Sequence, residues 1–153
     1  MNLIAQLLSS DDIVIDLIAS SKKRVFELAG QHFEKRYGIS KTAVFDALFA
    51  REKMGSTGLG LGIAIPHGRI KGLKEASGAF FRLAAPVPFD APDGQPVNLV
   101  FVLLVPEAAS ERHLQLLSEL AQMFSDKSFR ERLASAADAA AVYSLFSQWQ
   151  SVN

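Results

Sequence analysis

The apolar run "VNLVFVLLV" at residues 97–105 decides the fold class of this chain. A strand with one wet face alternates apolar and polar side chains, whereas a nearly continuous apolar run is typical of a strand covered on both faces. The run is nine residues long, which is about half of what a membrane-spanning helix requires. We therefore expect a central strand with helices packed on both sides.

Three further segments have the composition of strands. Residues 13–17, "IVIDL", are rich in β-branched side chains. Residues 62–66, "GIAIP", end at a proline, which favours extended geometry in the residue before it. Residues 78–84, "GAFFRLA", are separated from the apolar run by a connection rich in proline, with a turn pair at 93–94.

The other segments have helical spacing and capping residues. A helix from about residue 20 to 37 is expected to end at Gly38, and a second helix to begin after Ser40. Ser110, Asp126 and Asp138 are expected to cap three more helices in the last third. The side chains expected to face inward are Val44, Phe45, Leu48 and Phe49 in the second helix, Leu114, Leu117, Leu120, Ala121 and Phe124 after Ser110, and Val142, Leu145, Phe146 and Trp149 after Asp138.

The element order is a strand, two helices, three strands and three helices, which predicts an α/β protein. We expect a three-layer arrangement in which a mixed sheet of about four to five strands is flanked by helices on both faces. The 153 residues, of which 49% are hydrophobic, suit one globular domain spanning residues 1–153.

Charge and composition exclude several classes of partner. With 16 basic and 16 acidic residues the net charge is zero, so neither nucleic acid nor an anionic membrane is expected as a partner. Cysteine is absent from the sequence, which rules out disulfides and thiolate chemistry. The first residues, "MNLIAQLLSSDD", lack the positive start of a secretory signal. We expect a cytoplasmic protein that does not insert into membranes.

The stretch "GSTGLGLGIAIPHGRI", residues 55–70, holds five glycines. Ile63 replaces the third glycine of a dinucleotide fingerprint, and the sequence fits neither a Walker A motif nor a nucleophile elbow. Closely spaced glycines let backbone N–H groups converge on a phosphate-like anion, so Gly58 and Gly60 are candidate phosphate-binding residues. A glycine-rich strand edge is the alternative interpretation.

His67 makes phosphoryl transfer the favoured chemistry for this stretch. A neutral imidazole has a lone pair that can attack phosphorus, and Pro66 restrains the backbone just before it. The hydroxyls of Ser56 and Thr57 are candidate donors to phosphoryl oxygens, and Arg51 is a candidate charged contact. The alternative is that Ser56 and Thr57 are turn residues and that Arg51 is a solvated helix end.

The two other histidines differ in their surroundings. If Ser110 is an N-cap, His113 lies in the first helical turn, where it could donate to a phosphoryl oxygen or hold His67 in one tautomer; a solvated first-turn histidine is the alternative. His32 lies at the edge of an apolar stripe and is expected to be structural. The spacing of acidic residues and histidines suggests no metal, and we predict no cofactor.

The segment from Arg51 to Gly68, "RxxxGSTGLGLGIAIPHG", resembles the active-site segment of the mannitol/fructose-type enzyme IIA family of the bacterial phosphotransferase system. The similarity is greatest to the nitrogen-regulatory branch of that family. It continues through "PVPFDAPDGQPVNLVFVLLVP" and "HLQLLSELAQMF" and covers nearly the whole chain, which is thereby identified as an enzyme IIA type-2 domain.

The resemblance implies that His67 is phosphorylated, on Nε2, by an HPr-like phosphocarrier protein, and that Arg51 and His113 lie in the same pocket. The protein would be a phosphotransferase component with a phosphohistidine intermediate. Its phosphorylation state would signal to regulatory targets such as transporters or sensor kinases. Of Leu59, Leu61 and Ile63, one or two are expected to stay exposed around His67, where they would suit docking of a protein carrier.

Three alternative functions remain open from the sequence. The first is the enzyme IIA component of a mannitol/fructose-type sugar permease that passes phosphate to a IIB domain. The second is a hydrolase in which His67 acts with Arg51, although the only acids near in sequence are Asp46 and Glu52. The third is an anion-binding or interaction module with no covalent step.

Overall fold

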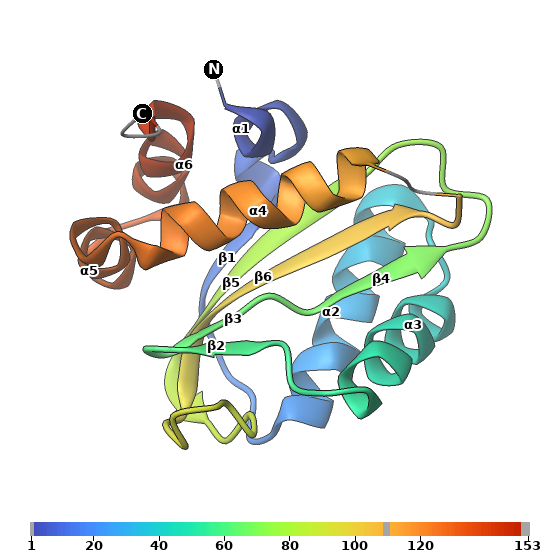
Figure 1. Ribbon diagram of the computed structural model, residues 1–153, viewed down its shortest axis with the longest axis horizontal. Coiled ribbons are helices and arrows are strands. Elements are labelled where there is room, and N and C mark those ends of the chain that lie inside the picture. The colour runs from blue at the N-terminus through green and yellow to red at the C-terminus, as the bar shows by residue number, and fades with distance from the viewer. Residues whose placement is uncertain (1, 109–110, 151–153) are drawn as a thin grey trace.

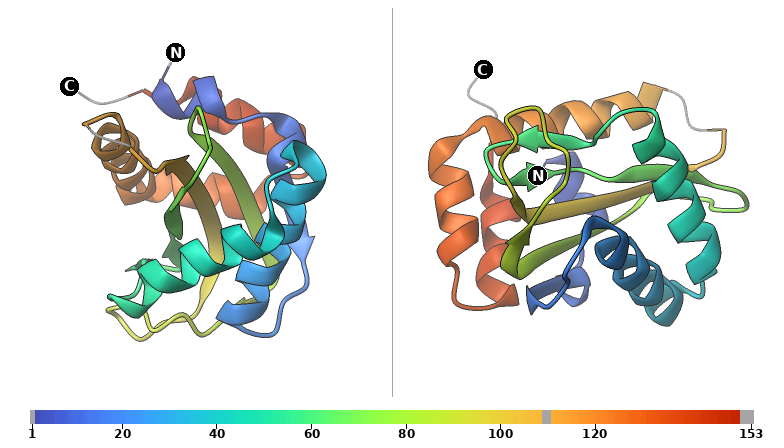
Figure 2. Two further views of the ribbon diagram at one scale, coloured as in Figure 1. Left: turned by 90° about the vertical axis from the view of Figure 1, so that its right-hand side faces the viewer. Right: turned by 90° about the horizontal axis from the view of Figure 1, so that it is seen from below.

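The computed structural model describes residues 2–108 and 111–150, which form a sheet between two layers of helices (Figure 1). The helices are α1 (Leu3–Leu7), α2 (Lys22–Tyr37), α3 (Lys41–Lys53), α4 (Glu111–Ser125), α5 (Lys127–Ser135) and α6 (Ala139–Gln148), with a short 3-10 helix, η1 (Ser10–Asp12). The strands are β1 (Ile13–Leu17), β2 (Gly58–Gly60), β3 (Ile63–Ala64), β4 (His67–Ile70), β5 (Ser77–Val87) and β6 (Val97–Pro106). Figure 2 shows α2 and α3 on one side of the sheet and α4 on the other.

The sheet is mixed, as predicted, and β6 lies at its centre. The strand order is β1-β5-β6-β3-β2, and β4 also pairs with β6. β6 is antiparallel to β5 and parallel to both β3 and β4, while β1 is parallel to β5. The predicted fold class is confirmed, but the sheet has six strands where we expected about four to five. The additional strands, β2 and β4, have three and four residues, too few to show an alternating pattern in the sequence.

Both faces of β6 are buried, as its continuous apolar sequence predicted. Leu99, Phe101, Leu103 and Val105 belong to the core on the side of α4, α5 and α6. Val100, Val102 and Leu104 alternate with them and belong to the core against α2 and α3. Successive side chains of a strand point to opposite faces of a sheet, so β6 separates two apolar cores.

Most of the predicted helix ends are confirmed. Gly38 ends α2 with φ of 71°, the left-handed conformation that glycine adopts without steric cost. The side chains of Ser40, Asp126 and Asp138 accept backbone N–H groups at the starts of α3, α5 and α6. Ser110, the cap expected for α4, lies outside the described residues.

The predicted inward faces of two helices need correction. In α4 the buried side chains are Leu116, Leu120, Met123 and Phe124, while Leu114 is 67% exposed and Ala121 is exposed as well. Leucines occupy several sides of this helix, so packing on the sheet, and not the pattern alone, selects the buried stripe. In α3, Phe49 was expected to face inward but is exposed, and it stacks on Phe45 near the surface with ring centroids 5.6 Å apart.

Within the described ranges, no helix is both long and apolar enough to cross a bilayer.

The start of β1 is joined to α2 by a buried polar cluster around Asp12. The Asp12 carboxylate is fully buried. It accepts hydrogen bonds from His32 Nε2 at 2.8 Å, from Arg36 Nε at 2.9 Å and from the Tyr37 hydroxyl. Burial alone would raise the pKa of the Asp12 carboxyl, but these hydrogen bonds outweigh it and hold that pKa below its ordinary value. His32 thus has a structural contact, as we predicted.

We expect Asp12→Asn to lower the free energy of unfolding by about 2 kcal/mol at pH 7, because the amide weakens hydrogen bonds to an ionised acceptor. Because the folded-state pKa is lowered, the carboxylate's contribution is fully present above the ordinary pKa of 3.8 and is lost as the pH falls through the folded-state value. Urea denaturation at pH 7 and at acid pH measures both effects. The exposed neighbour Asp11 supplies the control, Asp11→Asn; equal losses in the two variants would contradict the prediction.

Candidate functional site

The candidate site centres on His67, the first residue of β4, whose position is set by the contact of β4 with β6 and α3. His67 is in register with Leu103 of β6. A Cβ atom at the next residue, Gly68, would lie 2.9 Å from Cβ of Ala47 in α3. Glycine is therefore required for the close approach of α3 to β4, and this packing brings the C-terminal end of α3 toward His67.

A single hydrogen bond determines the tautomer of His67. Its Nδ1 lies 2.8 Å from the carbonyl oxygen of Ile65. A carbonyl oxygen can only accept, so Nδ1 carries the proton. In the neutral ring the lone pair is then on Nε2, the nitrogen that the resemblance to enzyme IIA proteins implied as the phosphorylated one.

The environment of His67 favours the neutral ring. Burial lowers the pKa of His67 below its ordinary value, and the positive charge of Arg51 and the nearby His113 lower it further. The hydrogen bond to Ile65 and the charge of Glu52 act in the opposite direction without reversing the shift. At pH 7 the ring is therefore predominantly neutral and has its lone pair available as a nucleophile.

His113 faces His67 from the first turn of α4. The ring centroids are 5.8 Å apart and the rings are inclined by 73°. Burial, and then the charge of Arg69, lower the pKa of His113. Its Nε2 atom is buried and has no hydrogen-bond partner among the described residues. An unpaired buried polar atom is costly, and such atoms are typical of sites that bind a further group.

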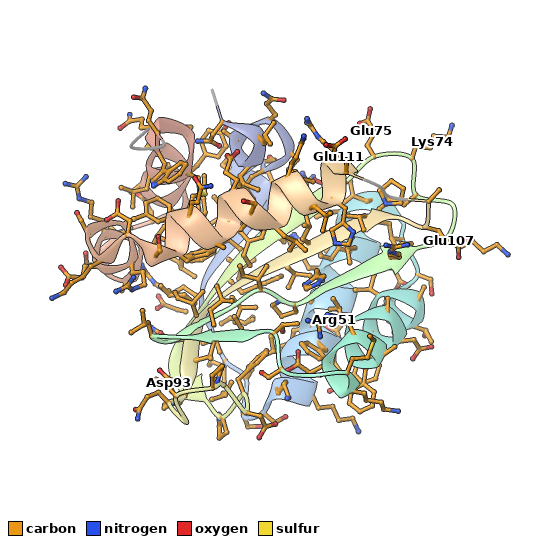
Figure 3. The ribbon with its side chains drawn as sticks, viewed as in Figure 1. Arg51, Lys74, Glu75, Asp93, Glu107 and Glu111 are labelled. Carbon is orange, nitrogen blue, oxygen red and sulfur yellow. The ribbon has the colours of Figure 1, made fainter. Side chains whose placement is uncertain are left out.

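Arg51 lies in the last turn of α3 and projects toward the sheet (Figure 3). One of its terminal nitrogens donates to the carbonyl oxygen of Gly55 at 2.7 Å. This bond uses only one of the guanidinium N–H groups and fixes the direction of the side chain. The structure thus brings His67 and His113 together and places Arg51 near enough for its charge to lower the pKa of His67. That the three share one pocket, and what chemical role each has, remain predictions.

The two hydroxyls predicted to bind phosphate are already engaged inside the protein. The Ser56 hydroxyl donates to the carbonyl oxygen of Phe89 at 2.7 Å, and the buried Thr57 hydroxyl donates to Glu52 at 2.6 Å. Their hydrogens are therefore not free for a phosphoryl oxygen in this conformation. The geometry favours the alternative interpretation, in which Ser56 and Thr57 shape the turn after α3.

Gly58 and Gly60 lie in β2, the edge strand of the sheet, which agrees with the alternative of a glycine-rich strand edge. Leu61 and Gly62 have φ of 59° and 82° and form the two-residue turn to β3, where both residues need positive φ. The amide of Leu61 donates to the Asp93 carboxylate at 2.9 Å, so a carboxylate of the protein itself occupies this turn. Phosphate binding by Gly58 and Gly60 remains an untested prediction. Leu59 and Leu61 are 47% and 65% exposed, while Ile63 is buried. The exposure expected for one or two of the three is confirmed; their proximity to His67 remains a prediction.

The sequence does not indicate how two charged residues, Glu52 and Arg69, lie relative to this site. Glu52 is only 7% exposed, although it lies in the polar sequence "REK". Arg69 is two residues beyond His67 in β4. Side chains two residues apart in a strand lie on the same face, so the sequence would have predicted this neighbour if β4 had been recognised as a strand. Within the described residues, no group of three histidine or acidic side chains is placed to bind a metal ion.

Comparison with known proteins defines the class first. Residues 6–149 match the family described as "Phosphoenolpyruvate-dependent sugar phosphotransferase system, EIIA 2", and the chain belongs to this family. Within it, the chain is similar to proteins named nitrogen regulatory protein. The one from Pseudomonas aeruginosa is 46% identical over 141 residues, which are 92% of each chain.

Solved structures agree with this assignment. The nitrogen regulatory protein IIA-Ntr from Neisseria meningitidis has 53% identity and a TM-score of 0.89, over 94% of this chain and 99% of that one. IIA mannitol from Escherichia coli has 26% identity and a TM-score of 0.75, over 90% and 97%. These findings confirm the resemblance to nitrogen-regulatory enzyme IIA and the α/β fold expected from it.

We expect the imidazole of His67 to titrate below the ordinary value of 6.5 and to be protonated on Nδ1 when neutral, because it is buried beside a cation and bonded to Ile65. Nitrogen-15 NMR of the histidine rings as a function of pH measures both properties, and His67→Gln assigns the signals by removing one set. A neutral ring protonated on Nε2, or a pKa above 6.5, would contradict the geometry.

Proposed function

We propose that this protein is a phosphocarrier and regulator of the nitrogen-related phosphotransferase system, and that it accepts a phosphoryl group on Nε2 of His67 from an HPr-like phosphocarrier protein. The observation that carries the proposal is the hydrogen bond from Nδ1 of His67 to the Ile65 carbonyl oxygen, at 2.8 Å. It leaves a nucleophilic nitrogen next to His113 and Arg51. Family membership supports the same role.

In the proposed reaction, the lone pair on Nε2 of His67 attacks the phosphorus of the donor's phosphohistidine. The nitrogen–phosphorus bond of the donor breaks as the new one forms, and the electron pair returns to the donor's ring. The Nδ1 proton of His67 stays in its bond to Ile65, so no base is needed to remove it. Arg51 and the Nε2 atom of His113 are the candidates for stabilising charge on the phosphoryl oxygens.

Phosphorylation would change what this surface of the protein binds. A phosphoryl group adds about two negative charges at neutral pH and strong acceptor oxygens. Any target that buries the region of His67 would bind one of the two forms in preference. We propose that such targets are regulatory proteins, including transporters or sensor kinases, and that the protein acts in the cytoplasm without a cofactor.

A second candidate is the enzyme IIA component of a mannitol/fructose-type sugar permease. The similarity to IIA mannitol from Escherichia coli supports this function, but the sequence identity of 26% is well below the 53% shared with IIA-Ntr from Neisseria meningitidis. The hydrolase alternative finds less support, since Asp46 is exposed and the Glu52 oxygens are bonded to Thr57 and Lys22. A transfer assay separates the two phosphocarrier functions: the regulatory role predicts little onward transfer to a IIB domain.

Incubation with phosphoenolpyruvate, enzyme I and an HPr-type carrier should increase the intact mass of the protein by one phosphoryl group. The modification should be labile to acid, as expected of phosphohistidine, and His67→Gln should abolish it. A reaction without enzyme I is the control. An unchanged mass of the native protein would refute the carrier function and leave the hydrolase and the anion-binding or interaction module as alternatives.

Replacing the guanidinium should slow phosphorylation without abolishing it. We expect Arg51→Gln to lower the initial rate on the order of 10²-fold, the usual effect of removing one donor that stabilises developing charge. Lys53→Gln, in the same helical turn but exposed, is the matched control and should keep the rate of the native protein. Equal rates in the two variants would show that Arg51 has no role in the transfer.

A further inference from the structure

Glu52 is a buried carboxylate that the proposed transfer does not use directly. It lies in the last turn of α3, next to Arg51, and is 7% exposed. Its Oε1 accepts the Thr57 hydroxyl at 2.6 Å and the Thr57 amide at 3.1 Å, with Oε2 at 3.2 Å from the same amide. Lys22 Nζ from α2 lies 3.1 Å from Oε2. The bonds to Thr57 close the turn after α3, and the contact with Lys22 joins Glu52 to α2.

The bonds of Thr57 continue to the reactive histidine. The carbonyl oxygen of Thr57 accepts the amide of Ile65 at 3.0 Å. The carbonyl oxygen of Ile65 in turn accepts Nδ1–H of His67 at 2.8 Å. The N–H and C=O groups of one residue belong to two peptide groups joined at its Cα atom, so these bonds fix the backbone positions of Thr57 and Ile65 in turn. Three residues, Glu52, Thr57 and Ile65, therefore lie in one chain of bonds that ends at the imidazole.

We infer that Glu52 is a positioning residue for His67. By holding Thr57 through both its amide and its hydroxyl, it fixes the carbonyl that holds Ile65, and Ile65 fixes the tautomer and direction of the ring. The same carboxylate shapes the turn whose Gly55 carbonyl holds Arg51. The effect on phosphorylation rests on the proposed function, whereas the effect on the ring of His67 does not.

Alternative roles for Glu52 do not fit its contacts. A general base needs an oxygen free to take a proton, and both oxygens of Glu52 already accept hydrogen bonds. A purely stabilising ion pair with Lys22 would not need the two bonds to Thr57. Lys22 pairs with the buried carboxylate at 3.1 Å and also reaches the exposed Asp90 at 2.9 Å.

The test compares Glu52→Ala with Asp12→Asn. Asp12 is also a buried carboxylate in a hydrogen-bonded cluster, but its bonds run to His32 and Arg36 of α2 and not to His67, so it controls for lost stability. In the unphosphorylated protein, nitrogen-15 NMR should show a mixture of His67 tautomers in Glu52→Ala and only the Nδ1–H form in Asp12→Asn. In the transfer assay, Glu52→Ala should lower the maximal rate roughly tenfold or more. The carrier concentration that gives half the maximal rate should be unchanged.

A double variant tests the mechanism and guards against misfolding. Lys22→Met combined with Glu52→Gln removes both charges but keeps an amide oxygen that can accept from Thr57. It should restore the Nδ1–H tautomer and bring the maximal rate to within about threefold of the native protein, since the rate depends on the position of the ring. Failure of this variant to restore the tautomer, while it remains folded, would overturn the inference.

The remaining outcomes separate the inference from the proposed function. An unchanged tautomer in Glu52→Ala overturns the inference, even if the rate falls. An equal loss of rate in Asp12→Asn also overturns it, because lost stability would then explain the effect. If the native protein is not phosphorylated at all, the proposed function fails, and the NMR comparison still decides whether Glu52 orients His67.

Discussion

Burial of β6 on both faces is the constraint on which the rest of the structure depends. Its side chains alternate between two apolar cores, and each buried aliphatic or aromatic side chain contributes roughly 1.5–3 kcal/mol. β3 and β4 both pair with β6, and the amide of Leu103 donates to the carbonyl oxygen of Pro66 at 2.9 Å. His67 is therefore held by pairing with the most buried of the described strands.

The features of the fold that could be predicted from the sequence are those with a local physical cause. A continuous apolar run indicates a doubly covered strand, and Gly38, Ser40 and Asp126 mark helix ends through bonds to residues close by in the chain. The buried face of α4 could not be predicted in the same way. Its leucines at 114, 116, 117 and 120 are compatible with more than one buried face of the helix. Only packing against the sheet determines that Leu116 is buried and Leu114 is exposed.

The same distinction holds for the site. His67 could be identified because the proline, the glycines and the histidine lie together in the chain and match a known family. The engagement of the Ser56 and Thr57 hydroxyls inside the protein could not be predicted, because the sequence does not show their acceptors; the Phe89 carbonyl oxygen is 33 residues away from Ser56. Likewise, the carboxylate that occupies the glycine-rich turn comes from Asp93, 32 residues beyond Leu61. The burial of Glu52 could not be predicted, because the cation that compensates it, Lys22, is 30 residues earlier.

The anchoring of His67 has a consequence for how its chemical state can be recognised. The inner edge of the ring is bonded to Ile65, and the backbone behind it belongs to a sheet packed from both sides. A group attached to the outer nitrogen would add its own volume and charge, while the rigid backbone around it would keep its conformation. A partner that distinguishes the two forms would have to respond to the added group itself, and the part of that discrimination that comes from charge would weaken as ionic strength rises.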